Sequence, residues 1–178
     1  MEKSADIGKF KKIFKEWILP FGIEIAVILL LINFVFFLVV VPTGSMIPTI
    51  DSGSMLFATH IYNPEENIKR GDILVFYSDE LQKNLVKRVI GLPGETVTID
   101  ENGKLYVDGK LTEESYVVFG SNWRGSFDVP EGCYLFLGDN RAGSYDARTW
   151  KEPYIHVSKI KGRAVFTLWP LGDFGTLK

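Results

Sequence analysis

The sequence predicts a mainly β protein in which a single N-terminal transmembrane helix precedes one β-rich domain. No residue from Ile25 to Val41 is charged, and only Asn33 in that run is polar. After this run, short apolar stretches alternate with Gly, Pro, Asn and Asp, a pattern typical of strands joined by turns. No window of 11 residues there has a convincing helical period of 3.6 residues. The length of 178 residues suits one domain with an appendage.

The predicted transmembrane helix rests on the stretch Ile18–Val41, whose only charged residue is Glu24 and whose 24 residues exceed the ~20 that a bilayer-spanning helix needs. Trp17 and the lysines before it suit an interfacial anchor. A cleavable signal peptide also has a basic start and an apolar segment, but no Ala-x-Ala-like site follows this one. A buried core helix rarely has so long an uncharged run. We therefore expect an uncleaved anchor over 17–38. Because the residues from Phe37 to Val41 are aromatic and β-branched, we expect its helix to stop near Phe36 and a strand to follow.

The charge distribution predicts the orientation of this anchor. Residues 1–16 carry five lysines and three acidic side chains, a net charge of +2. Positive charge before a span favours the cytoplasmic side. We therefore expect a cytoplasmic segment over 1–16 and an extracytoplasmic domain over 39–178, which places the chain in the cell membrane and in contact with lipid.

The expected strands are short apolar runs that follow or precede turn residues. The segment Glu101–Gly103, which contains Asn-Gly, predicts a hairpin between two of them. The runs are Met55–Ala58, Ile73–Tyr77, Asn84–Ile90, Thr96–Asp100, Lys104–Val107, Tyr134–Leu137 and Ala164–Leu168.

Composition argues against several classes of function. There are 20 basic and 22 acidic residues, so the net charge is −2, whereas a nucleic-acid-binding domain is normally basic. The single cysteine, Cys133, excludes an internal disulfide framework and a Cys-based zinc cluster. With only two histidines, a His-rich metal site is also unexpected. We expect no metal, no cofactor and no nucleic acid.

The first chemical candidate is Ser45, which lies just after the apolar run. Pro42 and Pro48 restrict the backbone on either side of it, and Gly44 permits a close approach before it. A rigid, exposed serine suits a nucleophile, although Pro, Thr, Gly and Ser are also common in an ordinary juxtamembrane turn. A serine nucleophile needs a base, and no distinctive motif surrounds His60 or His156.

Lys87 is the better candidate for that base. On a strand it shares one face with Leu85 and Val89. Removal of water from a lysine lowers its pKa from ~10.4, so a neutral amine becomes available near working pH. The alternative is a lysine on an edge strand with its ammonium group in water.

A third candidate element is the turn-rich stretch Gly138–Arg148. Asp146 and Arg148 lie two residues apart and suit a charge-assisted pair that fixes the loop. Ser144 suits a hydrogen bond to a buried amine. A solvated turn rich in Asp and Asn is the alternative.

Together these elements resemble bacterial type I signal peptidase in its short, single-anchor form. The resemblance runs from the anchor to about Trp169, and its motifs occur in the family's order. They are Pro42–Thr49, Gly71–Val75, Lys87–Glu95 and Gly138–Arg141.

The resemblance implies an all-β catalytic domain of coiled sheets and a serine endopeptidase. It would cut signal peptides from exported preproteins at Ala-x-Ala-like sites with a Ser-Lys dyad. Ser45 would be the nucleophile and Lys87 the general base. The Ser45 N–H and the Thr43 hydroxyl would form the oxyanion hole. Ser144 would orient the lysine, and Asp146 and Arg148 would support the loop. The residues that would line the substrate pockets are Val41, Pro42, Ile50, Leu85 and Val86.

Two other readings of the same residues remain open. The self-cleaving repressor peptidases also use a Ser-Lys dyad, but a membrane anchor argues against that clan. A non-enzymatic β-module on an anchor would leave Ser45 and Lys87 dispensable and far apart.

Overall fold

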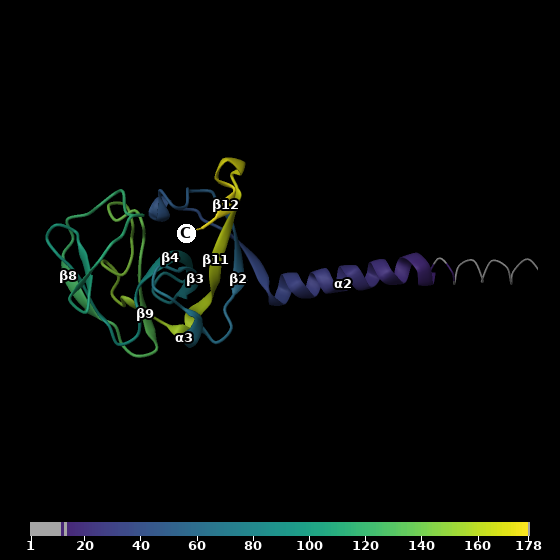
Figure 1. Ribbon diagram of the computed structural model, residues 1–178, viewed down its shortest axis with the longest axis horizontal. Helices are drawn as coiled ribbons and strands as arrows, with labels where there is room; N and C mark the ends of the chain where they lie inside the picture. The colour runs from purple at the N-terminus through teal and green to yellow at the C-terminus, as the bar shows by residue number, and fades with distance from the viewer. Residues whose placement is uncertain (1–11, 13, 178) are drawn as a thin grey trace, which may run out of the picture. The chain divides into compact units, whose positions relative to one another are not determined.

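The computed structural model describes residues 12 and 14–177. The chain divides into two compact units, Met1–Phe37 and Leu38–Lys178. In the first unit, the π-helix η1 (Phe14–Ile18) leads directly into the helix α2 (Leu19–Phe34), as Figure 1 shows. Most of the lysine-rich segment 1–16, and with it most of the charge used to predict orientation, lies outside the described residues.

The helix α2 ends where the sequence changes from helix-forming to strand-forming residues. The Val35 backbone N–H donates to the Leu31 carbonyl at 2.9 Å, and the strand β1 (Phe36–Val40) begins one residue later. Aromatic and β-branched side chains favour this change, and the predicted transition near Phe36 is confirmed.

The expected membrane-spanning helix over 17–38 is not found in this form. Over residues 12 and 14–177, no helix is both long enough and apolar enough to cross a membrane.

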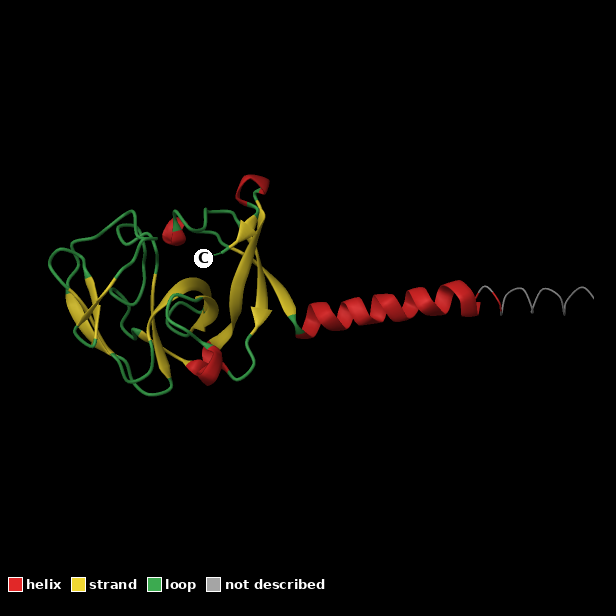
Figure 2. Cartoon of the chain, in the orientation of Figure 1, coloured by secondary structure: helices red, strands yellow, loops and turns green. Residues whose placement is uncertain are grey.

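The larger sheet follows the order β1-β2-β11-β3-β4-β9-β10, and β12 pairs with β11. Strands are drawn in yellow in Figure 2. Register shifts within β11 and between β4 and β9 are irregularities that bend and twist a sheet. Its further strands are β2 (Met55–His60), β3 (Ile73–Ser78), β4 (Lys83–Gly91), β9 (Cys133–Leu137), β10 (Tyr154–His156), β11 (Ile160–Trp169) and β12 (Gly175–Thr176).

The smaller sheet has the order β7-β6-β5-β8. Its hairpin between β5 and β6 is the predicted one, and Asp100 accepts hydrogen bonds there from the Asn102 and Lys104 backbone N–H groups. The strands are β5 (Thr96–Ile99), β6 (Leu105–Val107), β7 (Lys110–Thr112) and β8 (Gly125–Asp128). The short helices of the second unit are η2 (Gly44–Met46), α3 (Pro64–Asn67), η3 (Val157–Lys159) and η4 (Leu171–Asp173).

One apolar core joins the two sheets. It contains Leu74 and Phe76 of β3, Val97 of β5 and Phe136 of β9, all completely buried. The rings of Phe76 and Phe136 stack with their centroids 4.2 Å apart. Strands β3, β4 and β9 lie side by side above this core, so residues on their inner face are withdrawn from water. The protein is therefore mainly β, as the sequence predicted.

Candidate active site

The candidate nucleophile Ser45 lies in the short helix η2 and is only 7% exposed. The loop after β9 holds this turn through main-chain contacts. The Asn140 backbone N–H donates to the Ser45 carbonyl at 3.1 Å, and the Asn140 side-chain amide donates to the Gly44 carbonyl, also at 3.1 Å. The Thr43 hydroxyl donates to Ser45 Oγ at 3.4 Å. Ser45 is thus held from two sides, beside a second hydroxyl.

The candidate base Lys87 lies on the core face of β4. Its register partner on β3 is the completely buried Leu74, and two residues further along β4 the core residue Val89 pairs with Phe136 of β9. Directly opposed residues in a sheet share a face, so Lys87 projects toward the apolar core and is only 3% exposed.

The environment of Lys87 changes its proton affinity. Burial lowers the pKa of Lys87 from its ordinary 10.5 to about 8. The negative charge of Asp146 opposes this change, and the positive charge of Arg148 adds to it. Lys87 Nζ donates to Ser144 Oγ at 3.0 Å. The lysine thus has one oriented hydrogen bond and a markedly weakened preference for the charged form.

The loop 138–148 brings Ser144 to the lysine. A Cβ atom on Gly138 would clash with Ser144 Oγ and with the Ser45 carbonyl oxygen, so only a glycine permits this close packing. The same glycine donates its backbone N–H to Asp146 Oδ2 at 3.0 Å. Gly138 therefore lies at the meeting point of the nucleophile turn and the lysine's hydrogen-bond partner.

Asp146 and Arg148 form the pair that their spacing suggested. Arg148 Nε and Nη2 donate to the two carboxylate oxygens at 2.8 and 2.9 Å, and both side chains are almost completely buried. Burial alone would raise the pKa of Asp146, but the hydrogen bonds and charge of Arg148 and the Gly138 N–H lower it below its ordinary value. Asp146 stays ionised and holds the loop.

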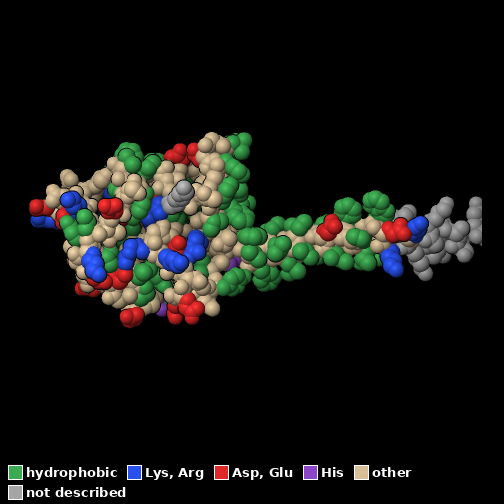
Figure 3. Space-filling model, viewed as in Figure 1, with side chains coloured by type: hydrophobic (Ala, Val, Ile, Leu, Met, Phe, Trp, Pro, Cys, Tyr) green, Lys and Arg blue, Asp and Glu red, His purple; other side chains and the backbone are tan. Residues whose placement is uncertain are grey.

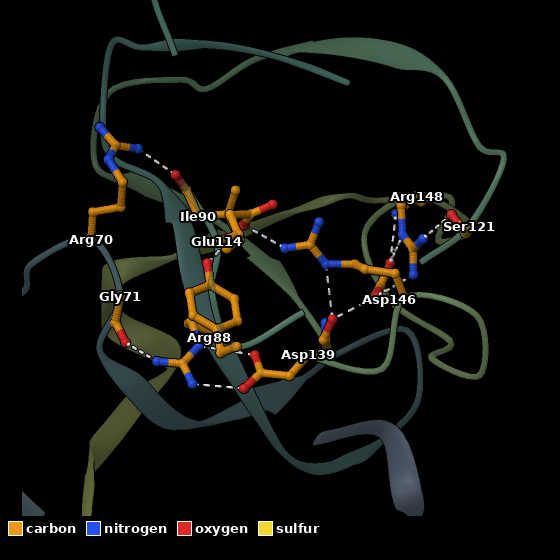
Figure 4. Close-up of polar contacts among 12 residues, drawn as sticks. Arg70, Gly71, Arg88, Ile90, Glu114, Ser121, Asp139, Asp146 and Arg148 are labelled. Atoms are coloured by element: carbon orange, nitrogen blue, oxygen red, sulfur yellow. Dashed lines mark hydrogen bonds and ion pairs between the residues drawn. The ribbon is translucent and has the colours of Figure 1, made fainter. Parts of the chain in front are cut away.

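A second arginine network beside this loop was not anticipated from the sequence (Figure 4). Arg88 donates Nε and Nη2 to the two oxygens of Asp139 at 2.9 and 2.6 Å, and the Thr49 hydroxyl donates to Asp139 at 2.5 Å. Arg141 donates to the Gly138 carbonyl at 3.0 Å and to Glu114 at 2.5 Å. The sequence signals were Arg88, which must point away from Lys87 because neighbouring strand residues alternate, and the motif Gly138–Arg141, which contains Asp139 and Arg141.

The structure places the proposed pocket residues in different environments. Val41 and Ile50 are buried at 3% and 2% exposure, and Pro42 is exposed. Leu85, which is half-buried, lies on the face of Lys87, whereas Val86 pairs with Val75 on the opposite face.

The two histidines lie on strands of the larger sheet, and the described residues contain no cluster suited to a metal ion. His60 lies on β2 opposite Gly162, and His156 on β10 contacts Ser158 Oγ through Nδ1 at 2.9 Å. In the part of the chain that the structure describes, no group of three or more His, Cys, Asp or Glu side chains is placed to hold a metal ion.

Ser45 and Lys87 are brought together through shared neighbours. Ser45 and Ser144 both contact Gly138, and Lys87 contacts Ser144. No hydrogen bond between Lys87 Nζ and Ser45 Oγ occurs among the described residues. Catalytic hydrogen bonds often tighten only in the substrate complex. The geometry therefore supplies a buried lysine, an oriented partner and a fixed serine within one small region.

Comparison with known proteins identifies the family. The sequence model described as "Signal peptidase, peptidase S26" matches residues 14–169. A signal peptidase I of Bacillus caldolyticus is 34% identical over 87% of this chain and 91% of its own length. A signal peptidase I of Bacillus amyloliquefaciens is 36% identical over 92% of this chain and 89% of its own length. The crystal structure of a signal peptidase I from Enterococcus faecalis has 30% identity and a TM-score of 0.49, over 55% of this chain and 96% of its own. The chain belongs to the signal peptidase family, peptidase S26.

Proposed function

We propose that Ser45 is the nucleophile and Lys87 the general base of this peptidase. As a member of the S26 family the chain is a serine endopeptidase that removes signal peptides. The observation that carries the assignment is the burial of Lys87, which lowers its pKa to about 8. Near pH 7 the neutral fraction rises from ~0.03% to ~9%, roughly 300-fold. A lysine with that fraction of free amine can accept a proton.

The proposed reaction has two steps that share the same lysine. The Ser45 oxygen attacks the peptide carbonyl carbon while its proton moves to Lys87 Nζ. Lys87 then gives this proton to the leaving amine, and an acyl-enzyme remains. In the second step Lys87 takes a proton from water, the hydroxide attacks the ester, and Ser45 regains its proton. Such a shared acid and base is common in serine-dependent peptidases.

Stabilisation of the oxyanion is assigned to the Ser45 backbone N–H and the Thr43 hydroxyl. The 3.4 Å contact of Thr43 with Ser45 Oγ supports this role, because a donor beside the nucleophile also lies beside the oxygen of the carbonyl group whose carbon Ser45 attacks. One such donor typically contributes ~3–4 kcal/mol to the transition state.

The substrates we propose are exported preproteins with Ala-x-Ala-like cleavage sites. Val41, Pro42, Ile50, Leu85 and Val86 carry the pocket assignment that the family resemblance implies. Their aliphatic side chains suit small apolar substrate residues better than charged ones.

We place the enzyme at the cell membrane, with its N-terminus in the cytoplasm and the β-rich domain outside. Hydrophobic side chains cover most of the visible surface of α2 in Figure 3, and the described residues from Ile18 to Ile32 are all exposed. An exposed apolar surface of this kind needs an apolar environment. Lipid provides this environment and holds the enzyme beside substrates that carry apolar segments of their own.

The two other classes are less well supported. A self-cleaving repressor peptidase does not account for relatives that match nearly the whole chain and are signal peptidases. A non-enzymatic module does not account for a buried lysine hydrogen-bonded to an oriented serine, an arrangement that costs stability.

The experiment that tests the dyad is cleavage of a purified preprotein. Ser45→Ala and Lys87→Ala should each abolish turnover, and the double variant should be no slower than either single variant, because the two act as a unit. His60→Ala and His156→Ala are the matched controls and should keep most activity. Loss of turnover in a folded histidine variant, or retained turnover in Ser45→Ala, would refute the assignment.

A further inference from the structure

A segment that connects two strands of the smaller sheet is hydrogen-bonded to the loop that carries Ser144. Residues 113–121, here called the strap, connect β7 to the stretch before β8. The strap contacts the loop 138–148 at three places: Glu114 with Arg141, the Phe119 carbonyl with the Ala142 backbone N–H at 3.1 Å, and Ser121 with Arg148. Glu114 and Ser121 are both labelled in Figure 4. The strap is thus bonded to two neighbouring residues in the first half of the loop and to the last residue of the loop.

The first contact fixes the Gly138 turn. Glu114 and Arg141 form an ion pair at 2.5 Å, and their side chains are only 9% and 4% exposed. Arg141 also donates to the Gly138 carbonyl at 3.0 Å. The Tyr116 hydroxyl of the strap donates to the same Glu114 carboxylate at 2.7 Å. The guanidinium carbon of Arg88 lies over the Tyr116 ring, 3.9 Å from its centroid. Glu114 therefore fixes the position of Arg141. Arg141 in turn holds Gly138, which is packed against both Ser45 and Ser144.

The contact between Ser121 and Arg148 fixes the other end of the loop. Arg148 uses Nε and Nη2 for Asp146, and its remaining Nη1 donates to Ser121 Oγ at 2.8 Å. Planar guanidinium groups act as rigid forks, so a third bond restricts the orientation of the whole pair. Ser121 thus helps to hold Asp146 and Arg148, whose charges both act on Lys87.

We infer that Glu114 and Ser121 are positioning residues for the proteolytic reaction, acting through Arg141 and Arg148 on the loop that orients Lys87. This inference rests on the proposed function of Ser45 and Lys87. Neither strap residue touches the serine or the lysine, and both would act by keeping Ser144 in place and water away from the amine.

The effect on Lys87 has a defined sign. Burial is the largest influence on its pKa, and the charges that face it are Asp146, Arg148 and Asp139 of the loop and Lys83 of its own strand. A loosened loop admits water, which favours the ammonium form and raises the pKa. Less free amine is then available at neutral pH. In a plot of kcat/KM against pH, the rising part on the acidic side should move to higher pH. Loss of stability alone would not cause this shift.

The main test is Glu114→Gln, with the exposed neighbour Glu113→Gln as the matched control. We expect the midpoint of kcat/KM against pH to rise by roughly half a unit or more in Glu114→Gln, so that kcat/KM near pH 7 falls about threefold or more. The decrease should appear in kcat more than in KM, and Glu113→Gln should match the wild type. A midpoint equal to that of the wild type would overturn the inference.

Ser121→Ala gives a second test that leaves both ion pairs intact and therefore decides the matter if Glu114→Gln fails to fold. It should raise the midpoint in the same direction, and Ser115→Ala on the exposed side of the strap should not. Val97→Ala removes buried volume from β5 and serves as the stability control. A shift as large in Val97→Ala would refute a positioning role. Ser45→Ala assayed in parallel separates the two claims, because activity in that variant would refute the dyad instead.

Discussion

Replacement of Lys87 by methionine should inactivate the enzyme and, near neutral pH, make it more stable. The reason is the cost of holding a lysine in the apolar core. Between pH 10.5 and about 8 the unfolded chain binds a proton at this site, whereas the folded chain does not. The stability of the wild type therefore falls as the pH decreases through this interval and is affected no further below about 8. A depression from 10.5 to about 8 corresponds to roughly 3 kcal/mol, at about 1.4 kcal/mol per unit.

The assay is denaturant-induced unfolding of the wild type and Lys87→Met at several pH values between 7 and 10.5. The gain in free energy of unfolding should be greatest at pH 7 and should decrease by roughly 3 kcal/mol toward pH 10.5. Loss of the bond to Ser144 and any change in packing add a constant that does not depend on pH. Lys110→Met, which changes an exposed lysine of β7 that does not act on the pKa of Lys87, should show no such trend. A difference between Lys87→Met and wild type that stays constant from pH 7 to 10.5 would show that the folded lysine titrates normally.

Three further outcomes follow from the geometry. Gly138→Ala should reduce preprotein cleavage strongly while the domain stays folded, because the new methyl group displaces Ser144; full activity in a kinetic assay would contradict this. Asp139→Asn leaves buried Arg88 without its counter-charge and should cost about 3–5 kcal/mol in denaturant unfolding, whereas Asp79→Asn, in an exposed pair, should cost below about 1 kcal/mol. Protease added outside spheroplasts should digest the β-rich domain and spare a small N-terminal fragment, and protection of the whole chain would reverse the proposed orientation.

The parts of the site that the sequence predicted depend on local periodicity. The face of Lys87 followed from the two-residue period of a strand, and β4 has the regular register with β3 that this requires. The Asp146–Arg148 pair spans only two residues, so adjacency along the chain was enough to suggest it. Hairpin β5–β6 followed from the turn residues between its strands.

The parts that sequence reasoning missed depend on contacts between distant segments. Glu114 and Arg141 are 27 residues apart, and no local pattern indicates that the strap contacts the loop 138–148. The strand Gly125–Asp128 has one buried apolar residue, Phe127, too weak a signal to predict β8. The predicted anchor over 17–38 extends past the helix, which ends at Phe34 and is followed by β1, because hydropathy alone does not separate helical from extended apolar residues.

The long separation between the members of the site has a consequence for synthesis. Lys87 and Ser144 are 57 residues apart, and Asn140 is 96 residues from the glycine whose carbonyl it holds. A growing polypeptide therefore contains its serine and its lysine well before the segment that orients them has been translated. In such a partial chain the lysine is hydrated and keeps a pKa near 10.4, so almost none of it is a base. With Ser45 and Lys87 in the roles proposed above, we expect proteolysis to require the complete fold, so a chain interrupted before Gly138 should contain both side chains and show no proteolytic activity.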